Sequence, residues 1–404
     1  MSHFGIRLST IAFIALTSTA NAQVQFQRIA QLATTNEATR PFSGGRKVEF
    51  SPDNKKVIAA FFGSTVQLFD LEKNVPIGEP IRTAGDGEVG FVNDEVGYTA
   101  DWKSLRLWDA NTGQQIGDSI PHQLREDTVI QPAIHPTGRY LATRATMTSV
   151  HLWNVADRRP IAEPMHFSAE VQAIRFSDDG LFLFVNTEGT VHAIGADNGK
   201  TVAGPIASTG LFQYFPKQQR LVTTEQTSTA VNQLVVRSTD QQGWPETHRA
   251  TLSGTLVRFL AIHDDQVLVH TTKNNRTPEL FAFRIDEPET RIEIETTADR
   301  AFGLVVPPDS RYWISTNIRD IKCQEFGKSE PLWQKQIPPS GFDQHLYPLD
   351  NEHFAIRDKQ EHFSIYKVAD GSEVWRQAGV KQCRLTKNLL ALCKSDGVEI
   401  WRME

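Results

Sequence analysis

The sequence predicts an all-β fold in which one four-stranded unit repeats along a single domain, and three observations lead to this prediction. A strand of similar pattern recurs at intervals of roughly 40 residues. Each of these strands follows a hairpin whose turn is rich in Pro, Asp, Gly and Asn. Residues 23–404 also exceed the usual size of a single hydrophobic core, so the chain either divides into two domains or grows by repetition.

The recurring strand is clearest in "LRLWDA" (105–110), where Trp108 serves as the reference position. Similar strands are "VHLWNV" (150–155) and "VQLFDL" (66–71), in which aliphatic residues alternate with others and an aromatic residue follows. The chain contains nine such reference positions: Phe69, Trp108, Trp153, Ile194, Val236, Phe283, Gln324, Tyr366 and Trp401. The spacing therefore predicts nine repeats, with eight as the alternative.

Each reference strand is preceded by a hairpin and followed by a further turn and a short fourth strand. Clear hairpins are "AIHPTGRYLATRA" (133–145) and "IRFSDDGLFLFVN" (174–186), and "ANTGQ" (110–114) is one of the later turns. Four short strands per unit are typical of a β-propeller blade, whose two faces are covered by the neighbouring blades. We therefore predict a single β-propeller of four-stranded blades.

The two ends of the chain are expected to meet in one blade. The ninth unit ends at Glu404 without a fourth strand of its own, whereas residues 24–33, "VQFQRIAQLA", alternate like a strand and precede the first hairpin. We predict that this N-terminal strand completes the last blade and closes the ring, which hides sheet edges that otherwise favour aggregation.

The first 22 residues have the pattern of a bacterial-type signal peptide. Arg7 precedes an apolar stretch, residues 8–20, that is too short to span a bilayer. The triplet Ala20-Asn21-Ala22 matches the small-x-small pattern of a cleavage site before Gln23. We expect residues 1–22 to be removed and residues 23–404 to form a periplasmic or secreted propeller without membrane insertion. A buried N-terminal helix is the alternative.

Composition and motifs narrow the function classes. The net charge of −6 argues against nucleic-acid binding, which normally requires a basic excess. The motifs of nucleophile elbows, zinc proteases and phosphate-binding loops are absent from the sequence, so we expect no cofactor and no metal. We expect a monomer with protein partners.

The three cysteines leave at least one thiol unpaired. Cys383 and Cys393 flank the turn formed by residues 386–388, which makes a disulfide between them one possibility. Buried free thiols are the other.

The first half resembles WD40 repeat proteins over roughly residues 45–206, and the second half has quinoprotein-like character. The WD40 likeness rests on "LRLWDANTG" (105–113), "FSPDNKKVIAA" (50–60) and "HFSAEVQAIRFSDDG" (166–180), where His166 matches the family's His. The resemblance also implies an Asp in the turn before the Trp strand. That turn offers Glu188 in one unit and residues 147–149 in another, so we expect a degraded network.

The quinoprotein-like likeness rests on "YKVADGSEVW" (366–375) and "EPLW" (330–333). Dehydrogenases of that family need an adjacent cysteine pair, which this sequence lacks, so the likeness implies shape alone.

The WD40 resemblance places the loops before each reference strand and before each new hairpin on one face. It implies a protein-binding surface that includes Trp102, Arg125, Glu126, Asp127, Arg144, Glu188, Arg276, Arg319 and Lys359. Trp102 is an aromatic residue in a polar turn, and Trp and Arg dominate interface hot spots. The alternative for Trp102 is that it covers a neighbouring blade.

The sequence thus predicts an exported propeller that acts as a protein-interaction scaffold without catalysis. One alternative is a propeller hydrolase of the lactonase or glycosidase type, with a site at the central channel. The other is a cofactor-free, quinoprotein-like factor of envelope assembly. An enzyme is expected to show ionisable groups with shifted pKa values converging on a pocket, whereas a scaffold is expected to show an exposed aromatic surface.

Overall fold

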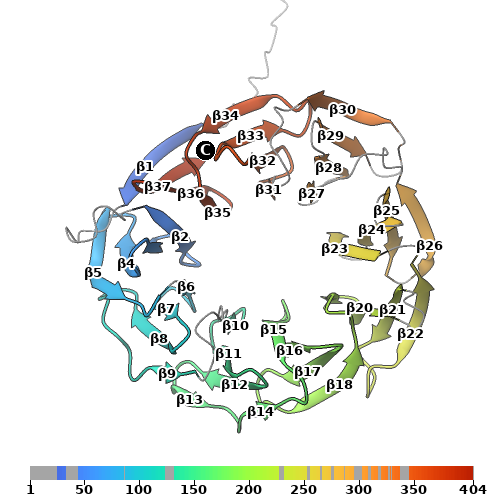
Figure 1. Cartoon of the computed structure of the whole chain (residues 1–404), viewed down its shortest axis with the longest axis horizontal. Helices are drawn as coiled ribbons and strands as arrows, with labels where there is room; N and C mark the ends of the chain where they lie inside the picture. The colour runs from blue at the N-terminus through green and yellow to red at the C-terminus, as the bar shows by residue number, and fades with distance from the viewer. Residues whose placement is uncertain are drawn as a thin grey trace, which may run out of the picture.

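The computed structural model consists of nine antiparallel β-sheets arranged in a ring (Figure 1). It describes residues 25–32, 44–85, 87–122, 132–226, 232–252, 255–263, 266–273, 277–285, 287–294, 303–307, 311–316, 320–325, 328, 330–336 and 345–403. Eight sheets have four strands, and one has five because two short strands share its outer edge. The predicted all-β propeller is confirmed.

We number the blades in chain order. Blade 1 contains β2 (Gly45–Phe50), β3 (Lys56–Phe61), β4 (Thr65–Asp70) and β5 (Val75–Arg82). Blade 2 contains β6 (Glu88–Phe91), β7 (Val96–Ala100), β8 (Ser104–Asp109) and β9 (Ile120–Pro121). Blade 3 contains β10 (Ala133–Ile134), β11 (Tyr140–Thr146), β12 (Ser149–Asn154), β13 (Arg159–Pro160) and β14 (Met165–His166). Blade 4 contains β15 (Val171–Phe176), β16 (Phe182–Thr187), β17 (Thr190–Gly195) and β18 (Thr201–Ala207). Blade 5 contains β19 (Phe212–Phe215), β20 (Arg220–Gln226), β21 (Asn232–Ser238) and β22 (Glu246–Thr251). Blade 6 contains β23 (Thr255–His263), β24 (Gln266–Lys273), β25 (Thr277–Arg284) and β26 (Glu287–Ile294). Blade 7 contains β27 (Gly303–Val305), β28 (Tyr312–Thr316), β29 (Asp320–Glu325) and β30 (Pro331–Gln336). Blade 8 contains β31 (His345–Pro348), β32 (His353–Arg357), β33 (Phe363–Lys367) and β34 (Glu373–Gln377). Blade 9 contains β35 (Gln382–Leu385), β36 (Leu389–Lys394), β37 (Gly397–Met403) and β1 (Phe26–Leu32).

Nine blades match the nine predicted repeats. Every reference position of the sequence lies in the third strand of a blade, from Phe69 in β4 to Trp401 in β37. Eight blades, the alternative count, is therefore wrong. Even the weakest repeat, which has Gln324 in place of an aromatic residue, forms a complete four-stranded sheet from β27 to β30.

The N-terminal strand completes the last blade, as predicted. β1 pairs antiparallel with β37, from Phe26 opposite Met403 to Leu32 opposite Val398. An apolar cluster that includes Leu32, Phe61 and Ile400 lies between this blade and blade 1. The two ends of the chain thus meet side by side in one sheet (Figure 1).

The core is divided into apolar layers between blades. Along β3 the buried side chains alternate: Val57 and Phe61 pack toward blade 9, whereas Ile58 and Ala60 pack toward blade 2. This period of two is what an antiparallel strand with both faces covered requires. The repeat stabilises the ring because each sheet buries its two faces against its neighbours.

The disulfide possibility between Cys383 and Cys393 is wrong. Cys383 lies opposite Leu392 and Cys393 lies opposite Gln382 on the paired strands, so the two thiols point to opposite faces of the sheet. They belong to different apolar clusters, and both are free. Burial raises the pKa of the Cys383 thiol to about 11 and that of Cys393 to about 12. Cys393 is buried and Cys383 is half-buried.

No helix that is long and apolar enough to cross a membrane occurs among the residues that the structure describes. The predicted signal peptide, residues 1–22, and the alternative of a buried N-terminal helix lie outside those residues.

Candidate functional site: the loop face of blades 1 to 4

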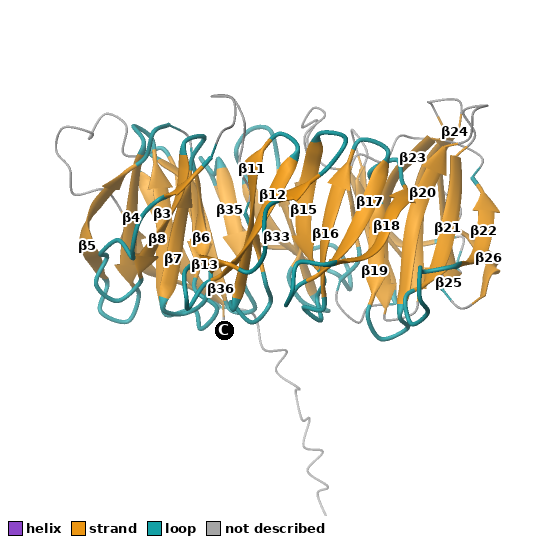
Figure 2. Cartoon of the chain, turned by 90° about the horizontal axis from the view of Figure 1, so that it is seen from below, coloured by secondary structure: helices purple, strands orange, loops and turns teal. Residues whose placement is uncertain are grey.

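The turns and links between strands gather along two opposite rims of the ring (Figure 2). Because neighbouring strands are antiparallel, the turns between second and third strands share a rim with the links between blades. Two hydrogen bonds join these segments: Phe62 N–H donates to Gly44 O at 3.1 Å, and Val171 N–H donates to Met147 O at 2.8 Å. We call this rim, made of those turns and links, the loop face.

Four of the nine predicted interface residues lie in the described part of the chain. Trp102, Glu188 and Lys359 occupy turns of the loop face, and Arg144 lies near the end of β11. Trp102, Arg144 and Glu188 come from the consecutive blades 2, 3 and 4, whereas Lys359 is far away on blade 8. The remaining five lie outside the described residues: Arg125, Glu126, Asp127, Arg276 and Arg319.

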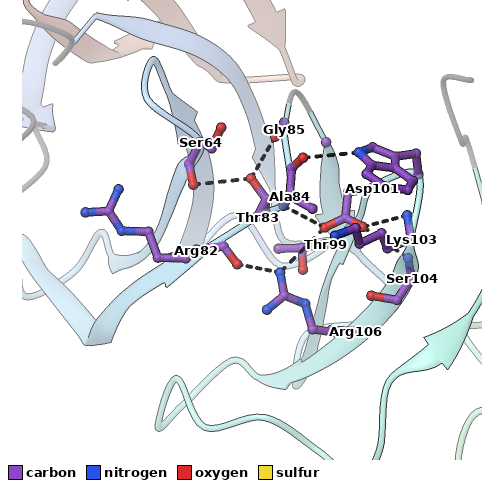
Figure 3. A network of polar contacts seen from close by, with 12 residues as sticks. Ser64, Arg82, Thr83, Ala84, Gly85, Thr99, Asp101, Lys103, Ser104 and Arg106 are labelled. Carbon is purple, nitrogen blue, oxygen red and sulfur yellow. Dashed lines mark hydrogen bonds and ion pairs between the residues drawn. The ribbon is translucent and has the colours of Figure 1, made fainter. Parts of the chain in front are cut away.

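Asp101 anchors the turn that carries Trp102 (Figure 3). Asp101 is only 6% exposed, and its Oδ1 accepts hydrogen bonds from the backbone N–H groups of Lys103 and Ser104, both at 3.0 Å. Its Oδ2 accepts the N–H of Ala84 at 3.0 Å, which ties the turn to the link between blades 1 and 2. A carboxylate that accepts three backbone N–H bonds fixes the turn, because such charge-assisted bonds are strong.

Trp102 is half-buried, as the alternative of a ring that covers a neighbouring segment would require. Its Nε1–H donates to Ala84 O at 3.2 Å, and one edge of the ring therefore covers the link from the neighbouring blade. The Nζ of Lys103 lies 4.7 Å from the ring centroid, within the range of a cation–π interaction. Part of the indole is exposed to solvent on the loop face.

Phe62 is an exposed aromatic residue on the same face as the half-buried Trp102, and sequence analysis missed it. It lies in the turn between β3 and β4 and is 37% exposed. The Nζ of Lys381, on the link between blades 8 and 9, lies 5.3 Å from its ring centroid. Its signal in the sequence was the second Phe of "FFGST" (61–65), directly before a turn glycine.

Two elements of the hydrogen-bond network implied by the WD40 resemblance, the Trp–Thr bond and the Asp in the turn, occur in blade 2. Trp108 Nε1–H donates to Thr99 Oγ1 at 3.0 Å, and Asp101 lies in the turn before the Trp108 strand. In blade 3 the equivalent bond runs from Trp153 Nε1 to Thr143 Oγ1 at 3.3 Å. The departures named from the sequence lie in blade 4, at Glu188, and in blade 3, at residues 147–149, and sequence analysis overlooked Asp101 of blade 2 although "ADWKS" (100–104) displays it.

Arg144 ties blade 3 to blade 4 instead of projecting freely from the surface. Its Nη1 donates a hydrogen bond to the carbonyl oxygen of Val171, the first residue of β15. Burial lowers the pKa of its guanidinium, and the nearby Glu170 carboxylate acts in the opposite direction. We therefore assign Arg144 a structural part in this face.

Three cavities in the described part of the chain border blade 3, with volumes of about 510, 550 and 400 Å³. The outer strand of this blade is interrupted: β13 pairs with the end of β12, and β14 pairs with its beginning. The cavity of about 550 Å³ lies between blades 3 and 4, and Glu188 forms part of its wall.

Ionisable residues on the inner strands are paired across blades. Lys47 on β2 pairs with Glu88 on β6, and Glu49 on β2 accepts from Arg384 Nε on β35 at 2.7 Å. Burial lowers the pKa of Lys47 and raises that of Glu49. These residues tie blades 9, 1 and 2 together, and the described cavities border blade 3 instead of this cluster. Among the described residues, no three potential metal ligands cluster together.

Comparison with known proteins shows the fold. No family model matches the chain, and no curated protein matches it in sequence. A eukaryotic initiation factor superposes with a TM-score of 0.61 at 13% identity, covering 82% of this chain and 87% of its own. The computationally designed protein Ika8 gives 0.52 at 12% identity, covering 93% and 99%. Hsv2 of Kluyveromyces lactis gives 0.50 at 11% identity, covering 72% and 99%.

At these identities the likeness is one of architecture. The solved structures therefore support the β-propeller in general, whereas the WD40 and quinoprotein-like likenesses rest on the sequence motifs alone.

Proposed function

We propose that this protein is an exported β-propeller that binds another protein through its loop face and acts as an interaction scaffold. The observation that carries the proposal is the state of Trp102: the ring is held by a hydrogen bond and by a turn anchored on Asp101, yet part of it faces solvent. Tryptophan dominates interface hot spots because it contributes a large contact area.

The fixed turn favours binding for an entropic reason. Association normally costs about 0.5–1.5 kcal/mol for each mobile side chain that is immobilised. The indole of Trp102 already has its Nε1–H bonded to Ala84 O, so less freedom remains to be lost. Phe62, exposed on the adjacent blade of the same face, offers a separate aromatic contact for the same partner.

Capture of partners by the tagged protein after crosslinking in cells, read by mass spectrometry, tests this surface. Trp102→Ala is expected to lower recovery of the specific partners at least about tenfold, which corresponds to about 1.4 kcal/mol of binding free energy. Leu181→Ala is the matched control, because Leu181 is 59% exposed in a turn between first and second strands, on the opposite rim. Equal recovery with Trp102→Ala and the unmodified protein would contradict the proposal.

We further infer that residues 1–22 direct export and are removed. The support is the arrangement of Arg7, the apolar residues 8–20 and the Ala20-Asn21-Ala22 triplet. Fractionation and N-terminal sequencing of the protein from a bacterial host are expected to give a periplasmic or secreted chain that begins at Gln23. A cytoplasmic chain that retains residues 1–22 would refute this inference.

A further inference from the structure

The cavity between blades 3 and 4 has an apolar floor and a rim of acceptor groups. Ile194 is 1% exposed at the floor, and Met165 and Phe167 from the outer edge of blade 3 are half-buried beside it. Its volume of about 550 Å³ lies in the range of about 300–1,000 Å³ that is typical of ligand sites. A long side chain with an apolar stem fits this combination.

The only formally charged group on the rim, among the lining residues that the structure describes, is the Glu188 carboxylate. Glu188 is exposed, and no residue of the described part forms an ion pair with it. No lysine or arginine is among the described residues that line the cavity. The site therefore offers one uncompensated negative charge beside an apolar floor.

The rim residues Thr190 and His192 are held by contacts with each other, with the buried Thr187 and with Phe167. His192 Nε2 lies 3.2 Å from Thr190 Oγ1, and Thr190 Oγ1 lies 2.7 Å from Thr187 Oγ1. The Phe167 ring meets the His192 ring edge-on at a centroid distance of 4.9 Å. Burial lowers the pKa of His192, which keeps its imidazole neutral near pH 7 and preserves the negative character of the rim. His166, also on the rim, is exposed.

We propose that this cavity binds an arginine side chain of the partner protein, with the guanidinium on Glu188 and the stem against Met165, Phe167 and Ile194. Charge complementarity selects a cation, and the planar guanidinium both pairs with a carboxylate and stacks on an aromatic ring. This inference rests on the proposed function, because it names the chemistry that the partner presents at a second point of the loop face.

Methyl NMR with two matched peptides tests the proposal. The probes are acetyl-Ala-Arg-Ala-amide and the same peptide with citrulline, which keeps the shape of arginine but lacks its charge. The chain contains four methionines, so the Met165 methyl signal is readily assigned by substitution, and the Ile194 methyl reports on the floor. The arginine peptide is expected to shift both signals saturably, and the citrulline peptide to bind at least about tenfold more weakly.

Two variants separate the site from the general charge of the surface. Glu188→Gln is expected to weaken binding of the arginine peptide at least about tenfold. Glu163→Gln removes the same charge from an exposed residue near β14 that does not line the cavity, and is expected to change nothing. Equal binding of the two peptides, no shift at Met165, or no effect of Glu188→Gln would overturn the proposal. A failed peptide test together with a loss of partner capture in Trp102→Ala would refute the arginine site alone. The proposed interaction surface would then still be supported.

Discussion

Blades 2 and 3 contain the same tryptophan–threonine hydrogen bond but hold the turn beyond it differently. In blade 2 Trp108 is 8% exposed and its bond to Thr99 measures 3.0 Å. In blade 3 Trp153 is only partly buried and its bond to Thr143 measures 3.3 Å. The reference tryptophan is therefore more deeply buried in blade 2 than in blade 3.

The difference lies in the residue that anchors each turn. Asp101 of blade 2 bonds both its own turn and the preceding link at Ala84. In blade 3 the corresponding residue is Thr146, whose Oγ1 accepts the Thr148 N–H at 3.2 Å and lies 2.7 Å from Ser149 Oγ. Both of these bonds stay within the turn. In blade 2 the carboxylate thus couples the turn to the preceding link, whereas in blade 3 the Thr146 hydroxyl bonds only within its own turn.

The largest expected change in stability comes from replacing the reference tryptophans of the two blades. Trp108→Ala is expected to cost about 3–5 kcal/mol of unfolding free energy, because it removes a buried ring and leaves Thr99 unpaired. Trp153→Ala is expected to cost clearly less, because that ring is only partly buried. Urea unfolding monitored by circular dichroism measures both variants. Equal losses would remove the asymmetry between the blades.

The next largest change in stability is expected from replacing Asp101 and Thr146, the residues that anchor the two turns. Asp101→Ala is expected to cost about 2–3 kcal/mol, since three backbone N–H groups lose a charged acceptor. Thr146→Ala is expected to cost about 1 kcal/mol for its neutral bonds. Asp101→Thr places the anchor residue of blade 3 in blade 2. Its loss of unfolding free energy is expected to lie between those of Asp101→Ala and Thr146→Ala in the same experiment. A Thr variant as stable as the unmodified protein would contradict the coupling role of Asp101.

A smaller effect involves pH and His122, which lies on the link between blades 2 and 3. Burial lowers the pKa of His122, while the Arg144 backbone carbonyl and the Asp101 carboxylate act less strongly in the opposite direction. The unfolded state then binds more protons below about pH 6.5, so stability is complete above that pH and falls as the solution is acidified. The unmodified protein is therefore expected to lose stability relative to His122→Phe between about pH 8 and about pH 5. Parallel losses in the two proteins would show that His122 does not contribute.

Trp102→Ala is expected to have an effect on stability as small as that of Thr146→Ala. The change removes one hydrogen bond of a half-buried ring, so it is expected to cost about 1 kcal/mol. A loss as large as that of Trp108→Ala would make Trp102 a core residue and would weaken the case for an interaction surface.

The repeat made the fold predictable from the sequence. One strand pattern occurs at nine positions, and a sheet with two apolar faces has to stack against copies of itself. The pairing of β1 with β37 followed from a C-terminal unit that lacked one strand. The disulfide prediction failed because the register places Cys383 opposite Leu392, the neighbour of Cys393, and successive residues of a strand point to opposite faces.

The candidate site was less predictable, because its features depend on contacts between blades. The link residue Ala84 gives no sign in the sequence that its backbone meets Asp101 and Trp102. The interruption between β13 and β14 includes Pro164, which has no N–H to donate. Yet β5 contains Pro76 and Pro80 and remains one strand, so the pattern of prolines does not predict the cavities beside blade 3.

Site-specific photo-crosslinking in cells tests the central claim, that the loop face beside the Asp101 turn contacts a protein partner. A photo-reactive amino acid is placed at Lys103, which is exposed next to Trp102, and in a second protein at Leu181 on the opposite rim. We predict a discrete, reproducible crosslinked protein from position 103 that is absent from position 181 and is lost when Trp102→Ala is added. No crosslink from position 103, or the same products from both positions, would contradict the account.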